Sequence, residues 1–495
     1  MSTLEFSTTD LSRHRIRAEN DAPWNASGAY VLYWMTAARR TRFNFGLQRA
    51  VEHALRLRKP LLVLEALRVD YPYASERLHA FVMDGMRDNA RAFSASRATY
   101  FPYVEPLRGA ARGLLTRLCA DAATVVTDWF PGFFLPRMLR AAAAKCGVRL
   151  ESVDSNGLIP VAAHGRAFPT ARGYRAFVQQ NLREFLASFP LEDPLRSLAS
   201  GRFDLPSALL DAWPPLDVSR SPSEILTSLP IDHTVGPVPI QGGSAAARTQ
   251  LTAFIRSKLA RYESEGNDPD ADCTSRLSPY LHFGHISAHE IFSEVMTHEG
   301  WTTRKLGNGR AGVREGWWNA GAGADHFLEQ LVVWRELAFN AAAWSRDVRS
   351  YESLPAWART TLENHLDDPR PALYSFEQLD AAETEDEVWN AAQNELRETG
   401  WCHGYMRMVW GKKMLEWCEH PREALGWMEA LMNRYSLDGR DPVSLMNYAW
   451  VLGRYDRPWF ERPIFGTVRC MTTASARRKL KMKNYLARFA NRTGQ

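Results

Sequence analysis

Short apolar runs alternate with amphipathic segments along the first third of the chain. The runs are rich in aliphatic and aromatic residues, have the length of buried strands, and lie at 29–35, 60–67, 123–130 and 148–154. Segments with hydrophobic residues at helical spacing lie between them, at 39–59, 79–95 and 133–147. Because alternating strands and helices are typical of parallel sheets, we expect a doubly wound, Rossmann-like α/β domain.

The hydrophobic pattern changes twice further along. From Leu205 to Ala245 it fades into a stretch rich in Pro, Gly and Ser, which is typical of a linker. After Ala246 nearly every segment has helical spacing, apart from a Gly-rich loop at 306–324. We therefore expect an N-terminal extension (1–25), an α/β domain (26–200), a linker (201–245), an all-α domain (246–485) and a tail (486–495).

Length, composition and charge limit the domain organisation, the partners and the location that we expect. A chain of 495 residues is too long for one hydrophobic core, which agrees with two domains. The net charge of +5 permits a polyanionic partner without requiring one. None of the six cysteines forms a CxxC pair or a zinc-like cluster, so we expect neither disulfides nor a metal site. With no signal-peptide pattern and no run of ~18 apolar residues, a cytoplasmic protein without a membrane span is expected.

Two polar motifs in the helical part are candidates for ligand binding. The α/β part has no glycine-rich nucleotide motif after a strand. TSRLSPYLHFGHIS, from Thr274 to Ser287, places hydroxyls and free amides before a helix, as an anion site would, although a capped helix start has the same pattern. DGRDP at 438–442 offers two carboxylates around a turn, and Arg407 could pair with a phosphate, a carboxylate or solvent.

Tryptophans are dense between positions 389 and 417. Trp410 and Trp417 are seven residues apart, so they share one face of a helix, and Trp389 belongs to the preceding helix. Core packing is the commoner reason for such a pattern. The alternative is an electron relay, because neighbouring indoles are oxidisable.

Taken together, these segments resemble the photolyase/cryptochrome flavoprotein family, and within it the class II cyclobutane pyrimidine dimer (CPD) photolyases. The motifs that carry the resemblance occur in the family's order between about Tyr30 and Arg478; they are YVLYWM, VVTD, LSPYLHFGHIS, VWRELAFN, WNAAQ, HGYMRMVWGKKMLEW, YSLDGRDP and ERPIFG. The resemblance implies that the all-α domain binds FAD and that the α/β domain can hold an antenna chromophore of deazaflavin or folate type.

The resemblance also implies roles for individual residues. On the phosphate and adenosine side of FAD it places Tyr262, Thr274, Ser275, Leu277 and Ser278, and near the isoalloxazine Arg335, Arg407, Asp438 and Asp441. Trp389, Trp410 and Trp417 match the electron-transfer tryptophans, with Trp410 nearest the flavin. Arg276, Trp334, Trp450 and Trp459 match the lesion side, where UV-damaged DNA is the expected partner.

Two positions depart from the class II pattern. The family usually has a second Glu facing the lesion where this chain has Gln330, which donates only a neutral N–H. It usually has Asn near flavin N5 three residues before Tyr435, where this chain has Met432 followed by Asn433. A thioether lacks the amide's hydrogen bond, so the relative stability of the flavin redox states should change.

These departures leave two functions open. The first is light-driven repair of pyrimidine dimers in DNA, a deoxyribodipyrimidine photo-lyase activity. The second is a cryptochrome-like blue-light photoreceptor that keeps FAD and the tryptophans but not repair. Retention of Trp450 and Trp459 favours repair, and the basic segments 137–140 and 477–483 suit either phosphate contacts or a solvated surface. A monomer is expected.

Overall fold

A six-stranded sheet forms the N-terminal part of the protein in a computed structural model, which describes residues 14–309 and 311–490. Its spatial order is β1-β6-β5-β2-β3-β4, with β1 antiparallel to β6 and every other pair parallel. The strands are β1 (Ile16–Ala18), β2 (Tyr30–Met35), β3 (Leu61–Leu67), β4 (Thr99–Val104), β5 (Ala122–Trp129) and β6 (Leu150–Asp154). The predicted doubly wound α/β domain is confirmed. Residues 1–13 of the predicted extension and 491–495 of the predicted tail lie outside the described residues.

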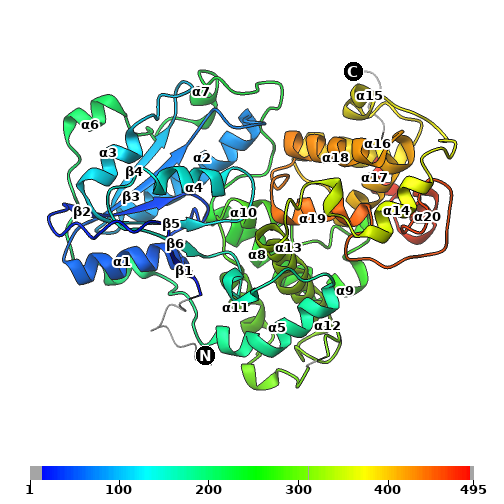
Figure 1. The fold of residues 1–495 in the computed structure, drawn as a ribbon, viewed down its shortest axis with the longest axis horizontal. Helices are drawn as coiled ribbons and strands as arrows, with labels where there is room; N and C mark the ends of the chain where they lie inside the picture. Colours follow the sequence, from blue (N-terminus) through cyan, green and yellow to red (C-terminus); the bar gives the residue numbers. More distant parts are fainter. Residues whose placement is uncertain (1–13, 310, 491–495) are drawn as a thin grey trace.

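The sheet buries both faces because alternate residues of its strands meet helices on opposite sides. From β2, Val31, Tyr33 and Met35 pack into one cluster with α1, whereas Leu32 and Trp34 pack into another with α3 and α4. Figure 1 shows these helices on the two sides of the sheet. The helices of this half are α1 (Phe45–Leu57), α2 (Glu76–Ser94), α3 (Leu114–Asp121) and α4 (Leu135–Ala143).

The chain leaves the neighbouring strands β2 and β5 toward opposite faces, which makes their carboxyl ends a topological switch point. The Asp128 carboxylate, near the end of β5, accepts hydrogen bonds from the backbone N–H groups of Thr36, Ala37 and Ala38 at 2.8–2.9 Å. These bonds hold the loop after β2 at the edge of the sheet where ligands of such folds bind.

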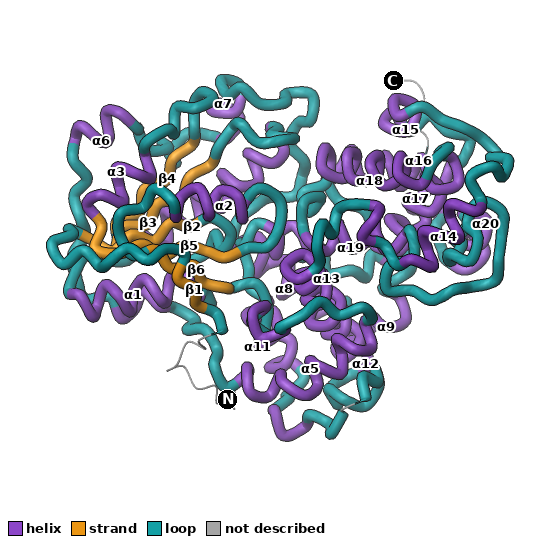
Figure 2. The backbone as a smooth tube through the Cα atoms, in the orientation of Figure 1, coloured by secondary structure: helices purple, strands orange, loops and turns teal. Residues whose placement is uncertain are grey.

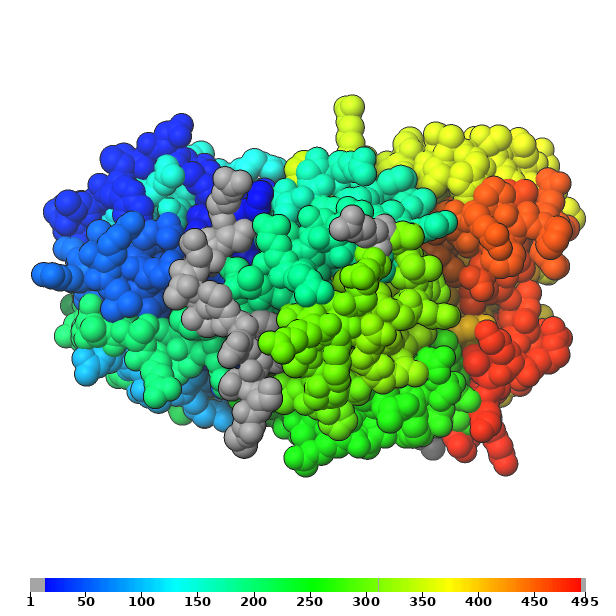
Figure 3. Space-filling view, turned by 90° about the horizontal axis from the view of Figure 1, so that it is seen from below, coloured from blue at the N-terminus to red at the C-terminus, as the bar shows by residue number. Residues whose placement is uncertain are grey.

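The second half of the chain is helical, as predicted, and packs around two large hydrophobic clusters. Figure 2 shows its helices beside and below the sheet, and Figure 3 shows the last segment, in red, at the end of the molecule away from the α/β domain. The helices are α8 (Ser244–Ser257), α9 (Tyr262–Glu265), α10 (Ser278–His282), α11 (Ala288–His298), α12 (Ala322–Leu328), α13 (Arg335–Trp344), α14 (Ala356–Asn364), α15 (Phe376–Ala381), α16 (Glu387–Thr399), α17 (Gly404–Trp417), α18 (Pro421–Tyr435), α19 (Pro442–Val451), α20 (Thr473–Lys479) and α21 (Lys483–Phe489).

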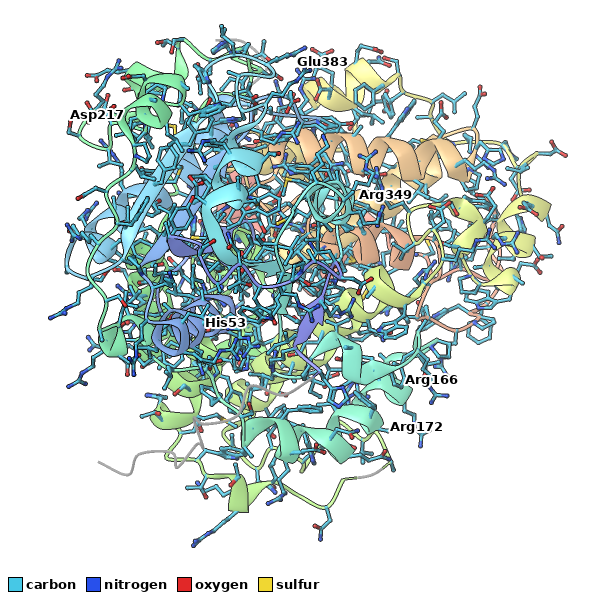
Figure 4. The ribbon with its side chains drawn as sticks, turned by 60° about the vertical axis from the view of Figure 1, so that its left-hand side comes forward. His53, Arg166, Arg172, Asp217, Arg349 and Glu383 are labelled. Carbon is cyan, nitrogen blue, oxygen red and sulfur yellow. The ribbon has the colours of Figure 1, made fainter. Side chains whose placement is uncertain are left out.

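Two segments connect the halves. Helix α5 (Ala171–Leu186) places Tyr174, Val178 and Leu182 in a core cluster shared with helices of the second half. Its first turn carries Arg172, which extends outward beside Arg166 in Figure 4. The predicted linker then returns along the α/β domain through α6 (Ser207–Ala212) and α7 (Pro222–Leu226). Among the described residues no helix is long and apolar enough to cross a bilayer.

Candidate functional site

The three candidate tryptophans form a continuous buried chain of rings. The rings of Trp389 and Trp410 lie nearly parallel, 5° apart in orientation, with centroids separated by 6.3 Å. Trp389 also meets Trp417 edge to face at 5.5 Å. The order in space is therefore Trp410, Trp389, Trp417, and the tryptophan from α16 stands between the two from α17.

Hydrogen bonds fix the orientation of these rings. Trp389 Nε1 donates to the carbonyl of Trp410 at 3.0 Å, and Trp410 Nε1 donates to Oε1 of Gln393 at 3.0 Å. At the outer end, Trp417 meets the half-buried Tyr374 at 5.0 Å, and Lys413 Nζ lies 4.5 Å from the Trp417 ring centroid. Tyr374 was not identified from the sequence, since it lies 43 residues before Trp417.

A buried ion pair stands one turn before Trp410 on α17. Arg407 donates to Oδ1 of Asp438 at 3.1 Å and to the Ser444 hydroxyl at 3.4 Å. Burial opposes ionisation of Asp438, but the Arg407 guanidinium and the hydroxyls of Ser278 and Ser436 outweigh it and lower its pKa. The carboxylate form of Asp438 therefore persists in the interior.

Polar atoms of residues predicted to hold the cofactor lack hydrogen-bond partners although they are buried. In the part of the chain that the structure describes, these atoms include Nε of Arg407 and Oγ1 of Thr274. Because buried polar atoms are almost always paired, unpaired ones mark a place where a polar ligand would bind. The donor set, with its arginine and hydroxyls, fits the heteroatoms and phosphates of FAD.

The loop before α10, predicted to hold the phosphate side of the cofactor, contacts the ion pair through Ser278. α10 begins at Ser278 with Pro279 in its first turn, and the Ser275 hydroxyl accepts from the Leu277 N–H at 3.4 Å. The interaction of Ser278 with Asp438 ties the loop to the ion pair. Tyr262 packs edge to face on neighbouring aromatic rings, with Phe254 at 5.6 Å.

Asp441 and Arg335 approach the site from two further helices. Asp441 caps α19 by accepting from the Val443 N–H at 2.9 Å, and its other oxygen lies 3.2 Å from Nδ1 of His282. Arg335 donates to the carbonyl of Asn156 at 2.7 Å. Burial lowers the pKa of Arg335, and the Asp441 carboxylate partly offsets this.

Gln330 lies on a π-helical turn, η6 (Glu329–Trp334), which the sequence pattern did not predict. π-turns inside α-helices are frequent at functional sites. The Gln330 side chain is exposed, whereas the carboxylate of Glu329 is paired with buried Arg175. Glu329 is thus held away from the place that Gln330 occupies. Trp334 closes the turn and is half-buried.

An arginine connects the two tryptophans of the C-terminal region that are predicted to face the lesion. Cζ of Arg469 lies 5.7 Å from the Trp450 ring centroid and 5.0 Å from that of Trp459. Nζ of the buried Lys412 also lies 5.2 Å from the Trp450 ring centroid. Arg276, the remaining lesion-side candidate, pairs with Asp272 at 2.9 Å. Arg469 is not recognisable as a site residue from the sequence, because its contacts with Trp450 and Trp459 exist only in the folded structure.

Met432 and Asn433, at the second position that departs from the class II pattern, have different surroundings. Met432 is fully buried in the hydrophobic cluster that contains the tryptophan chain. Asn433 lines a pocket of about 160 Å³ together with Phe134 and Arg349, which is labelled in Figure 4. Their predicted influence on flavin N5 stays a prediction.

A second, larger cavity of about 460 Å³ opens at the switch-point edge of the sheet. Its lining is mainly aromatic and aliphatic, with Trp34, Tyr71 and Phe133 among it. Arg440, from the DGRDP turn of the helical half, contributes a buried guanidinium. Its NH1 and NH2 atoms have no hydrogen-bond partner. No sequence pattern indicates that this arginine reaches the α/β domain.

An α/β domain joined to a helical domain with such a buried polar site defines the photolyase fold, and two solved structures share it. A bacterial class III photolyase from Agrobacterium tumefaciens superposes with a TM-score of 0.61 at 17% identity, covering 93% of this chain and 86% of that one. An archaeal photolyase from Sulfolobus tokodaii with two FAD molecules gives 0.63 at 14% identity, covering 93% and 90%.

Sequence relatives identify the family. The chain is 35% identical to the deoxyribodipyrimidine photo-lyase of Methanothermobacter thermautotrophicus over 484 residues, which are 97% of this chain and 98% of that protein. It is 30% identical to the enzyme of the same name from Potorous tridactylus, over 98% of this chain and 85% of that protein. The chain belongs to the deoxyribodipyrimidine photo-lyase family, as its motifs predicted. No family model matches the chain.

Proposed function

We propose that this protein is a light-driven DNA repair enzyme that splits cyclobutane pyrimidine dimers with FAD as its cofactor. One observation carries the proposal: the buried chain of tryptophans ends one helical turn from Arg407, where buried polar atoms lack partners. Such a chain is suited to bringing electrons from the surface to a buried redox cofactor.

The residues of the site would have separate roles in binding the cofactor and in keeping it reduced. Arg407, Asp438 and Ser278 hold the polar part of the cofactor, and their mutual hydrogen bonds pre-organise them. Bound FAD supplies the redox chemistry, which is a light-driven electron donation to the dimer and its return after the ring opens. Trp417, Trp389 and Trp410 would relay electrons from an external reductant to the cofactor and so keep it reduced.

On the substrate side, exposed Gln330 would donate an N–H to a carbonyl of the dimer. A protonated glutamate would donate a stronger hydrogen bond and also a proton. Trp450 and Trp459 offer ring faces on which the flipped bases stack. This chain would therefore repair, but more slowly than a variant with glutamate at position 330.

The test is dimer loss under blue light. Reduced, FAD-loaded protein is incubated with thymine-dimer DNA in light and in the dark, and Gln330→Glu is compared with the unaltered chain. We expect light-dependent repair, and repair about 100-fold faster in the variant, at the low end of general-acid effects. Absence of repair in both proteins, with flavin photoreduction intact, would overturn the proposal and favour the photoreceptor alternative.

We further propose that the 460 Å³ cavity holds a second, antenna chromophore with an anionic group. The aromatic lining suits a flat ring system, and the unpaired guanidinium of Arg440 suits an anion beside it. Protein purified from its own host should release a second chromophore, seen by absorbance after removal of FAD. The Arg440→Met variant should lose that chromophore and keep FAD; equal retention of both by the variant would contradict this assignment.

A further inference from the structure

We propose that Cys119 and Cys146 form a redox modification site, at which a peroxide converts the two thiols into a reversible disulfide and so narrows the cavity that they line. The cavity is the one of about 460 Å³ at the switch-point edge of the sheet, and both cysteines belong to its lining. Both thiols are free in the structure. The site belongs to the α/β half, so the inference does not depend on the repair function proposed for the helical half.

The fold brings the two cysteines together from different elements. Cys119 lies near the end of α3, Cys146 lies in the turn after α4, and both side chains belong to the hydrophobic cluster on one face of the sheet. A hydrogen bond joins their thiols, and Sγ of Cys146 lies 3.4 Å from the carbonyl oxygen of Val148. A disulfide is within reach, because the two sulfur atoms need only move from this contact to the bond length of about 2.05 Å.

The pair combines a reactive thiol with a partner thiol. The hydrogen bond from Cys119 stabilises a thiolate on Cys146 and lowers its pKa, and the same contact raises the pKa of Cys119. In the helical half, burial raises the pKa of Cys402 and of Cys418. Because the thiolate is the reactive form of cysteine, Cys146 should react with an oxidant before Cys402 or Cys418 does.

The cavity gives a small oxidant access to this pair. Cys119 and Cys146 are only 4% and 7% exposed, but their place in the cavity wall lets a molecule the size of hydrogen peroxide meet them. Thiolate Cys146 attacks one peroxide oxygen, so an S–O bond forms, the O–O bond breaks, and the departing hydroxide takes up the proton that Cys146 released. The sulfur of Cys119 then attacks the resulting sulfenic acid, so the S–S bond forms, the S–O bond breaks, and the hydroxyl leaves as water with the proton of Cys119. Two thiols thus give two electrons to one peroxide, and a dithiol reductant reverses the change.

The disulfide would change the cavity because it joins two parts of the cavity wall. Leu115 of α3 and Met138 of α4 line the cavity together with the two cysteines. Drawing the two sulfur atoms together brings the end of α3 closer to the turn after α4. The turn 144–147 can follow this movement, since it is exposed apart from Cys146 itself. Oxidation should therefore weaken the binding of a flat, anionic molecule in the cavity.

Peroxide treatment, alkylation of the remaining thiols and peptide mass spectrometry test the disulfide. In the unaltered protein we expect a peptide pair cross-linked through Cys119 and Cys146 that dithiothreitol separates, formed about 10-fold faster than Cys418 is oxidised. Cys119→Ala should leave Cys146 as a sulfenic or sulfinic acid, whereas the control, Cys418→Ala, should form the cross-link at the unaltered rate. Oxidation of the two cysteines to separate acids, or no faster than Cys418, would overturn the proposal in the unaltered protein alone, whatever the stability of the variants.

The effect on the cavity is measured with anilinonaphthalene sulfonate, a flat aromatic anion whose fluorescence reports binding. Because a narrowed site is overpacked by the same ligand, we expect peroxide to weaken binding of this probe about 10-fold in the unaltered protein and in Cys418→Ala. Dithiothreitol should restore the binding, and peroxide should leave Cys119→Ala unchanged. Unchanged binding in protein that carries the disulfide would refute the narrowing. Repair of thymine-dimer DNA by the reduced protein is assayed in parallel, so a failure of the proposed function is seen separately from a failure of the thiol pair.

Discussion

Trp389 has a central position that its place in the sequence does not suggest. It is the ring that contacts both Trp410 and Trp417, and no ring contact between those two bypasses it among the described residues. Replacing it with phenylalanine keeps an aromatic ring but removes the easily oxidised indole. We therefore expect Trp389→Phe to slow flavin photoreduction by an external donor at least 10-fold.

The matched control is Trp301→Phe. Trp301 is also a buried tryptophan of the helical half, and its Nε1 donates to a backbone carbonyl, that of Trp318. Both variants lose similar packing, costing on the order of 1–3 kcal/mol of the free energy of unfolding. Only Trp389→Phe should change the photoreduction rate under steady illumination. Similar rates in the two variants would mean that electrons reach the flavin by another path.

At the scale of elements, a hydrogen bond to a buried glutamate of α16 joins helix α21 to α16. Glu395 of α16 accepts hydrogen bonds from the Tyr485 hydroxyl and the His403 N–H, both at 3.0 Å. Burial raises the pKa of Glu395 from 4.5 to about 7. The folded protein therefore holds a proton that the unfolded chain releases between pH 4.5 and 7. Stability from this group is present below pH 4.5 and is lost as pH rises to about 7.

Glu395→Gln should remove this loss of stability at higher pH, because the amide oxygen accepts both hydrogen bonds and does not titrate. The difference in free energy of unfolding between pH 5 and pH 8, measured with urea, should shrink by about 3 kcal/mol at most. Burial also raises the pKa of Glu336 to about 7. In the variant, Glu336 therefore still makes the free energy of unfolding fall as the pH rises. An unchanged difference in the variant would show that Glu395 is ionised in the folded state.

The elements also show where sequence patterns suffice. The four predicted strands correspond to β2, β3, β5 and β6, because each is a continuous apolar run. β4 was missed since it contains Pro102, which is tolerated only at a sheet edge, where β4 lies. β1 was missed because three residues are too few for a pattern. The π-turn at Gln330 follows from tertiary packing, which periodicity does not record.

At the scale of the whole molecule, sequence motifs predicted which residues form the candidate site, whereas the contacts between those residues depend on the fold. Ser278, Arg407 and Asp438 stood in recognisable motifs, and the fold brings them together. Arg440 and Arg469 acquire their significance only from partners distant in sequence, Tyr71 and Trp450. A single sequence contains no information on such pairs beyond the resemblance to a family.

The two halves of the molecule are joined by a buried arginine whose removal should weaken the whole protein. Arg77, on α2 of the α/β half, donates to the carbonyls of Tyr435 at 2.7 Å and Arg397 at 2.6 Å, near the ends of α18 and α16. The negative ends of these helices favour the cation. Burial lowers the pKa of Arg77 to about 10, so it stays charged at neutral pH.

Arg77→Ala should cost about 3 kcal/mol of the free energy of unfolding, because it leaves buried helix carbonyls without donors. The control, Arg91→Ala, removes an exposed arginine from the same helix, and its pair with Asp88 contributes about 0.5 kcal/mol. Urea denaturation followed by tryptophan fluorescence and by bound flavin measures both. Equal midpoints in the two variants would mean that apolar packing alone holds the halves together. A larger shift in Arg77→Ala would show that the hydrogen bonds of Arg77 between the two halves contribute to the stability of the whole protein.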